Sequence, residues 1–149
     1  MLYSFIRSAI KNLRTYVFII LWSCFAFTGC ATHVQMYPGE ALEAGKQAII
    51  RSDNETGDHI GIFKVDNKIT TLSPIRAREV SVLPGKHTIF VIVEYPFSHA
   101  SGSLWLIAEP GGRYIVKESS DWRRVTMWIE DEKTGKKVGG ITGSDDEPQ

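Results

Sequence analysis

Short β-prone runs, separated by turn residues and without any long helical period, most limit how this chain can fold. Turn signals recurring about every 8–12 residues are typical of antiparallel sandwiches and small barrels. We therefore predict an all-β domain, a small antiparallel β-sandwich or barrel of about seven strands. The runs are Gln47–Arg51, His59–Asp66, Glu79–Leu83, His87–Tyr95, Ser103–Ala108, Arg113–Lys117, Val125–Glu130 and a short one around Val138.

Two glycine-containing turns predict how these strands pair. Pro84-Gly85 separates Glu79–Leu83 from His87–Tyr95, the most β-prone run in the chain. Pro110-Gly111-Gly112 separates Ser103–Ala108 from Arg113–Lys117 in the same way. Tight turns between consecutive strands favour antiparallel pairing. We expect one hairpin at each turn.

The first 29 residues have the organisation of a secretory signal peptide. Arg7, Lys11 and Arg14 form a basic region without acidic residues, and the apolar stretch Val17–Phe27 follows. This stretch falls within the roughly 7–15 residues of a signal peptide and short of the ~20 that span a membrane. A permanent anchor helix is the alternative, because Leu13–Tyr16 could lengthen the span. We expect residues 1–29 to be cleaved off.

The segment Phe27-Thr28-Gly29-Cys30 resembles the lipobox of bacterial lipoproteins, with Phe27 in a position where leucine is usual. The resemblance implies that Cys30 carries a diacylglycerol through a thioether and becomes the first mature residue. An aspartate after that cysteine favours retention in the inner membrane. Ala31 stands there instead, so the resemblance implies the periplasmic leaflet of the outer membrane.

Cysteine usage and length set the domain organisation. Cys24 and Cys30 are the two cysteines. Lipidation and cleavage therefore leave no free thiol for a disulfide, a zinc site or catalysis. About 120 mature residues can bury one sufficient core. We predict a lipidated tether at 30–45, a β domain at 46–142 and a disordered acidic tail at 143–149.

The charge balance limits the classes of partner. The chain has 17 basic and 17 acidic residues, and loss of residues 1–29 leaves 14 basic ones. A mildly acidic domain argues against nucleic acid and against electrostatic binding to anionic lipid. Membrane attachment is then expected through the acyl chains on Cys30.

The side chains give little sign of catalysis. The four histidines are widely separated and show no metal-ligand spacing, and Ser101 and Ser103 lack a nucleophile elbow. We predict no catalytic residue, metal or cofactor. Trp105, Tyr114 and Trp128 are expected to fill the core. The candidate ligand contacts are Trp122, Arg123 and Arg124, where a tryptophan lies among charged neighbours.

Several segments together resemble a group of small, uncharacterised lipoproteins of Gram-negative bacteria. Their Pro-Gly-His-Thr-like hairpin is also similar to PEGA-type β modules. The resemblance implies no activity, catalytic residue or cofactor, and the one site it supports is the acylated Cys30. The segments are Tyr37-Pro38-Gly39, Val65-Asp66-Asn67, 82–88 (VLPGKHT), 108–114 (AEPGGRY) and 128–135 (WIEDEKTG).

Three functional hypotheses follow. The leading one is a non-enzymatic, lipid-anchored β module that faces the periplasm and binds another envelope protein or glycan, or supports envelope structure. The second is a hydrolase acting on the cell wall through carboxylates such as Glu94, Glu109 or Glu118. The third is a carrier of a small apolar ligand. Paired carboxylates in a deep pocket would favour the second hypothesis, and a sizeable interior void would favour the third.

Overall fold

The chain folds as an all-β domain. The computed structural model describes residues 33–53, 59–70, 77–121 and 123–148, and this part contains strands and no helix. The fold class is therefore confirmed, but ten strands replace the expected seven or so. They are β1 (His33–Gln35), β2 (Ala48–Ser52), β3 (Ile60–Val65), β4 (Lys68–Ile69), β5 (Glu79–Val82), β6 (Gly85–Tyr95), β7 (Ser98–Ala108), β8 (Arg113–Ser120), β9 (Val125–Asp131) and β10 (Lys137–Ile141).

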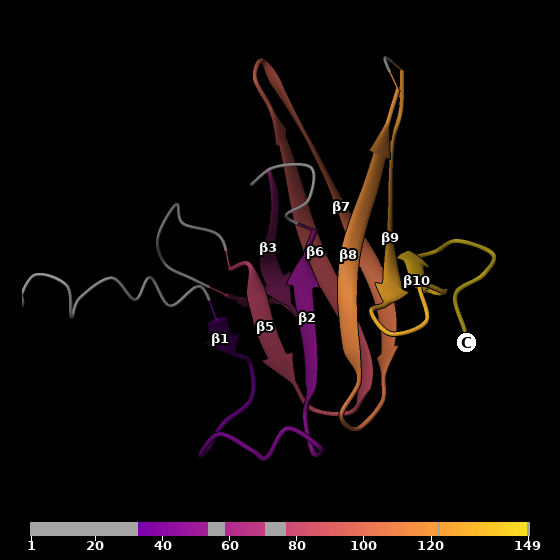
Figure 1. The fold of residues 1–149 in the computed structure, drawn as a ribbon. Helices are drawn as coiled ribbons and strands as arrows, with labels where there is room; N and C mark the ends of the chain where they lie inside the picture. Colours follow the sequence, from indigo (N-terminus) through magenta and orange to yellow (C-terminus); the bar gives the residue numbers. More distant parts are fainter. Residues whose placement is uncertain (1–32, 54–58, 71–76, 122, 149) are drawn as a thin grey trace, which may run out of the picture. The chain divides into compact units, whose positions relative to one another are not determined.

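One continuous sheet contains all ten strands, in the order β1-β5-β2-β8-β9-β10-β7-β6-β3-β4. The sheet curls on itself into a half-barrel instead of forming two separate layers (Figure 1). Two pairs, β1 with β5 and β2 with β8, are parallel, whereas the others are antiparallel. The expected purely antiparallel arrangement is wrong at these two pairs.

Neither predicted hairpin forms. β5 pairs with β1 and β2, whereas β6 pairs with β3 and β7. The Pro84-Gly85 turn therefore carries the chain between distant parts of the curled sheet, and the β7–β8 connection does the same. The long hairpin is instead β6–β7, which is in register from Gly85↔Ala108 to Tyr95↔Ser98. Local turn signals showed where the chain turns, but the choice of partner depended on how the strands share one core.

The two ends of the half-barrel differ in their connections. The β6–β7 and β8–β9 hairpins reach one end, here called the hairpin end, where β6 ends at Tyr95 and β8 ends at Ser120. The opposite end, here called the closed end, has the β5–β6 and β7–β8 connections and the 36–47 segment (Figure 1).

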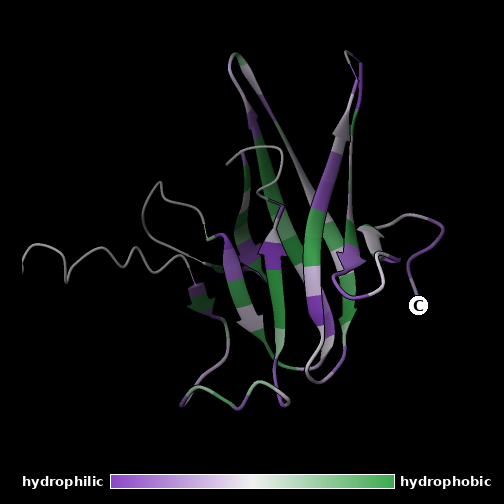
Figure 2. Cartoon of the chain, in the orientation of Figure 1, coloured by the Kyte–Doolittle hydropathy of each residue, from purple (hydrophilic) through white to green (hydrophobic). Residues whose placement is uncertain are grey.

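The core inside the curl is aliphatic. Residues two apart along each strand point inward, as the period of a β-strand requires. Hydrophobic colour follows the strands below the hairpin tips (Figure 2). Of the expected core aromatics, Tyr114 and Trp105 are buried, Tyr114 within the main cluster and Trp105 beside it, whereas Trp128 is only half-buried. The fully buried side chains include Ile50, Ile62, Val65, Val80, Val82, Ile89, Val91, Val93, Leu104, Leu106, Val116 and Ile129.

The segment expected to be a tether is part of the domain. β1 pairs in parallel with β5, and Val34 and Met36 pack against the core. Tyr37 is buried, and its hydroxyl donates to Gln47 Oε1 at 2.7 Å while accepting the Leu42 N–H. The boundary predicted at residue 46 therefore splits one packed unit, because a short strand with few apolar residues gives little signal in sequence.

The acidic tail, expected to be disordered, makes contacts over Gly143–Pro148. Lys137 Nζ lies 2.7 Å from Asp146 Oδ2, and Lys86 Nζ lies 3.0 Å from Glu147 Oε1. Lys86 also donates to the Pro148 carbonyl. Because β7 lies between β10 and β6, these ion pairs connect the tail to strands on both sides of β7.

Two of the segments that carry the family resemblance meet in space. Asp66 and Asn67 have positive φ values of 49° and 64° and form the two-residue turn between β3 and β4. Asp66 Oδ1 accepts the Thr88 N–H, and Asp66 Oδ2 lies 2.6 Å from His87 Nδ1. These contacts fasten the β3–β4 turn to β6, which gives both segments a structural role.

Candidate functional site

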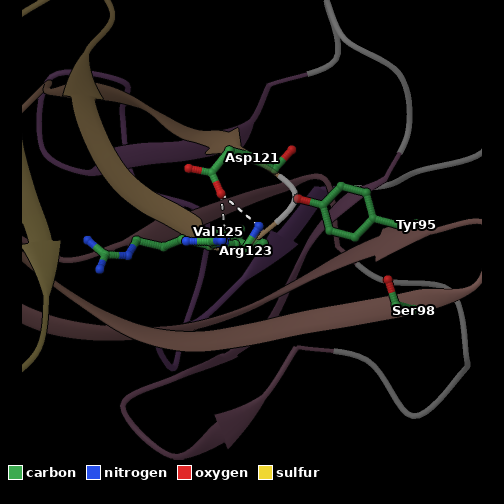
Figure 3. A pocket seen from close by; sticks show the side chains of 7 residues that line it. Tyr95, Ser98, Asp121, Arg123 and Val125 are labelled. Atoms are coloured by element: carbon green, nitrogen blue, oxygen red, sulfur yellow. Dashed lines mark hydrogen bonds between the residues drawn. The ribbon is translucent and has the colours of Figure 1, made fainter.

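A hollow lies between the two hairpins at the hairpin end. It has a volume of about 360 Å³ and receives residues from the end of β6, the start of β7 and the β8–β9 turn. Figure 3 shows the Tyr95 ring and Ser98 on one side and Asp121 with Arg123 on the other. Its lining residues are Tyr95, Ser98, Ser120, Asp121, Arg123, Arg124 and Val125.

Asp121 orders the turn that presents the two arginines. Its Oδ1 accepts the backbone N–H groups of Arg123 and Arg124, both at 2.8 Å. Its own N–H donates to the Arg124 carbonyl at 2.9 Å. An aspartate that binds backbone groups two and three residues on fixes a tight turn locally. The exposed Arg123 and Arg124 thus belong to a defined loop, in which Figure 3 shows Arg123 beside Asp121.

Next to the hollow, a hydrogen-bonded clasp joins distant strands. Glu118 of β8 accepts a hydrogen bond from the Tyr95 hydroxyl at 3.0 Å through Oε2. Its Oε1 lies 3.1 Å from His59 Nε2, and the His59 and Tyr95 rings are 6.0 Å apart. β8 is separated from β6 in the sheet order by three strands, so Glu118 reaches across the curl. The clasp replaces aliphatic packing at this end.

Burial is the main cause that raises the pKa of Tyr95 above its usual value, and a hydrogen bond with Ser120 acts in the opposite direction. The neighbouring Glu118 adds to the increase. Tyr95 therefore stays protonated near neutral pH and can donate its hydrogen bond to the carboxylate.

The chemistry of the hollow suits recognition of an anion. The lining residues include two arginines, Arg123 and Arg124, and three hydroxyl-bearing residues, Tyr95, Ser98 and Ser120. Arginine matches carboxylate and phosphate geometry with paired donors. The negative groups nearby are already engaged, Glu118 by the clasp and Asp121 by its turn. The Tyr95 hydroxyl is likewise engaged by Glu118, so the positive charge of the two arginines is the feature that suits an anion.

The structure describes only some of the site residues that were selected from sequence. The structure places Arg123 and Arg124 together at the hollow, while Trp122 and Cys30 lie outside the described residues. Sequence reasoning missed Tyr95, Ser98 and Ser120, because they are far apart along the chain. Their common signal is position at strand ends that border the two hairpin turns, which becomes visible only once the β6–β7 and β8–β9 pairings are known.

The three carboxylates considered for hydrolysis are not brought to one place. Glu118 belongs to the clasp at the hairpin end, whereas Glu109 follows β7 at the closed end. Glu94 is exposed and alternates with the inward-facing Val93 and Tyr95. This distribution provides no pair of these carboxylates around one substrate.

A second hydrogen-bonded chain was not anticipated. Ser81 Oγ lies 3.0 Å from His33 Nε2, and His33 Nδ1 lies 2.7 Å from Glu79 Oε1. The order of groups resembles a serine hydrolase relay. However, Ser81 is only 1% exposed, so its hydroxyl is shielded from a substrate. The contacts instead fasten β1 to β5.

Among the described residues, no group of three or more His, Cys, Asp or Glu side chains could hold a metal ion. In the same part of the chain, no helix has the length and apolarity needed to cross a membrane.

Comparisons with protein-family models, with curated proteins and with solved structures found no match. The case for a function therefore depends on the residues and their geometry.

Proposed function

We propose that this chain is an envelope lipoprotein, anchored by acyl chains on Cys30, whose β domain binds an anionic group of another envelope component. The domain faces the periplasm from the outer membrane and acts without catalysis. The lipobox-like segment supports the anchor, and Ala31 after the cysteine supports the outer membrane. The observation that carries the binding role is the hollow at the hairpin end, where an ordered turn presents Arg123 and Arg124.

The anchor is tested by replacing Cys30 with serine. A hydroxyl is not a substrate for the lipid transfer that precedes signal cleavage, so Cys30→Ser should lose acylation and accumulate as the uncleaved precursor. Metabolic labelling with a palmitate analogue measures the first effect, and mass on a denaturing gel measures the second. Equal labelling of variant and parent would contradict the lipoprotein assignment.

The binding role is tested on the acylated protein in intact envelopes. Chemical crosslinking should capture a discrete partner with the parent chain, and Arg123→Gln/Arg124→Gln should lose it. Lys136→Gln is the matched control, because it removes an exposed cation from the β9–β10 turn, away from the hollow. Loss of the same crosslink in the control, or its survival in the double variant, would refute the assignment of the hollow.

No specific observation on the described residues supports either alternative, the cell-wall hydrolase or the carrier of a small apolar ligand. The carboxylates named for hydrolysis lie apart, and the core cluster consists mainly of aliphatic side chains of zero or near-zero exposure. The binding module is therefore the function that the geometry supports best.

A further inference from the structure

The distance along the chain from Cys30 to the folded sheet is very short. β1 begins at His33, three residues after Cys30. An extended chain spans at most about 3.3–3.6 Å per residue, so the two Cα atoms are within about 11 Å of each other. If Cys30 carries the lipid, the edge of the sheet cannot move far from the membrane surface.

β1 is not free to detach and lengthen this link. It pairs with β5 over its whole length, and the Met36 N–H continues the pairing to the Ser81 carbonyl at 2.9 Å. The His33 contacts with Glu79 and Ser81 add side-chain bonds at the first residue of the strand. The sheet edge is therefore fixed where the N-terminal chain leaves it.

A hollow of about 370 Å³ opens beside this edge, and we call it the seam. β1 and β4 are the outermost strands of the sheet order, and residues of both line the seam. Val34 and Met36 contribute from the β1 side, and Lys68 and Ile69 contribute from β4. Ile69 is 51% exposed, which makes it a large apolar side chain open to solvent at the seam.

We propose that the seam rests on the phospholipid leaflet that holds the acyl chains of Cys30. This inference depends on the proposed lipid anchor. The short link brings the β1 edge to the leaflet, and Ile69 offers an apolar group to the boundary between headgroups and acyl chains. Lys68 can extend its ammonium group to the headgroups while its methylenes remain in apolar surroundings. The domain is thus oriented on the membrane and not suspended from a flexible tether.

A single labelled thiol tests the orientation. The mature, acylated chain has no free cysteine, so Ile69→Cys gives one site for an environment-sensitive fluorophore. The full lipoprotein is inserted in vesicles of phosphatidylethanolamine and phosphatidylglycerol that contain spin-labelled lipids. Interfacial contact places a group about 5–10 Å into the headgroup and acyl boundary, so we expect quenching at position 69 at least about twofold above a distant site.

The distant site is Phe97→Cys, at the tip of the β6–β7 hairpin, where the native side chain is 102% exposed. A second variant carries about twelve additional Gly and Ser residues after Thr32, which form a flexible coil of roughly 20 Å. This longer link should at least halve the amount by which quenching at position 69 exceeds quenching at position 97. Unchanged excess quenching after the insertion would overturn the role of the short link.

Mass spectrometry of Cys30 on the same preparation separates the two proposals. If Cys30 is acylated and the two sites are quenched equally, the seam does not contact the leaflet and the anchor stands. If Cys30 is unmodified, both the anchor and the orientation fail.

Discussion

The closed end and the hairpin end are parts of the same strands but contain different side chains. Near the closed end, β5, β6 and β7 bury Val82, Ile89 and Leu106 completely. At the hairpin end, the same inward-facing series continues with Tyr95 on β6 and with Glu118 and Ser120 on β8. Burial of aliphatic side chains contributes most to stability. At the hairpin end, hydrogen-bonded polar side chains take their place, and a hollow stays open beside them. The fold is therefore expected to depend on one end and ligand binding on the other.

The largest effect should follow from opening a cavity at the closed end. Leu106→Ala removes a fully buried side chain and should reduce the free energy of unfolding by about 2–5 kcal/mol. Val125→Ala, at the half-buried start of β9, should cost less than about 1 kcal/mol. Urea denaturation of both variants measures the difference. Equal losses would show that stability is spread evenly between the two ends.

Removal of residues 33–44 should have the next largest effect. The sequence-based division into a tether at 30–45 and a β domain at 46–142 implies that a chain beginning near Gly45 folds by itself, but such a chain lacks β1 and the buried Tyr37. Burial of one large side chain alone contributes about 1.5–3 kcal/mol, so the loss should exceed about 2 kcal/mol. Thermal melts of the shortened domain and of one beginning at Thr32 give the result. Matching midpoints would mean that this segment is not part of the packed unit.

Gly85→Val tests the turn at the closed end. Gly85 has a φ of +140°, which β-branched residues rarely adopt. No atom lies within 4 Å of an added Cβ, so backbone strain is the expected cause. The loss should exceed the ~1 kcal/mol of an average substitution. Leu83→Val, at an exposed neighbour, should change stability by less than about 0.5 kcal/mol. Equal denaturation midpoints for the two variants would exclude strain.

The clasp at the hairpin end should appear in the pH dependence of stability. Burial raises the pKa of Tyr95, so the unfolded chain releases this proton at a lower pH than the folded chain. Its contribution is fully present below the usual pKa of 10.0 and is lost as pH rises through the higher folded value. Tyr95→Phe should flatten the decline above pH 10. Burial also raises the pKa of Tyr114, so part of the decline should persist.

Trimming Gly143–Pro148 should have the smallest effect. Its ion pairs with Lys86 and Lys137 are exposed, and such pairs contribute little in water. The thermal midpoint should move less than in any variant above. Melts at low and high salt provide the measurement, with Lys86→Gln as the single-residue counterpart. A loss comparable to that of Leu106→Ala would reveal a core role for the tail.

Much of the local structure could be predicted from sequence. The alternation in Val125–Glu130 and the long β-prone run after Gly85 correspond to β9 and β6. The run His59–Asp66 corresponds to β3, whose register with β6 shifts between Ile62 and Lys64. Arg123 and Arg124, selected from sequence as candidate ligand contacts, line the hollow, and their contact with a ligand stays a prediction. These features are local, because they depend on side-chain period and turn chemistry.

The all-β class, the positions of the turns and the apolar strand faces can be predicted from sequence, because these properties depend on neighbouring residues. The pairing of strands depends on contacts between distant residues and is seen only in the folded sheet. Val80 and Val82 would be buried in the core whether β5 paired with β6 or lay across the core from it. The local sequence pattern cannot distinguish these two arrangements. The hollow depends on the same choice, because Tyr95, Ser120 and Arg124 become neighbours only when the sheet curls and brings the two hairpins together.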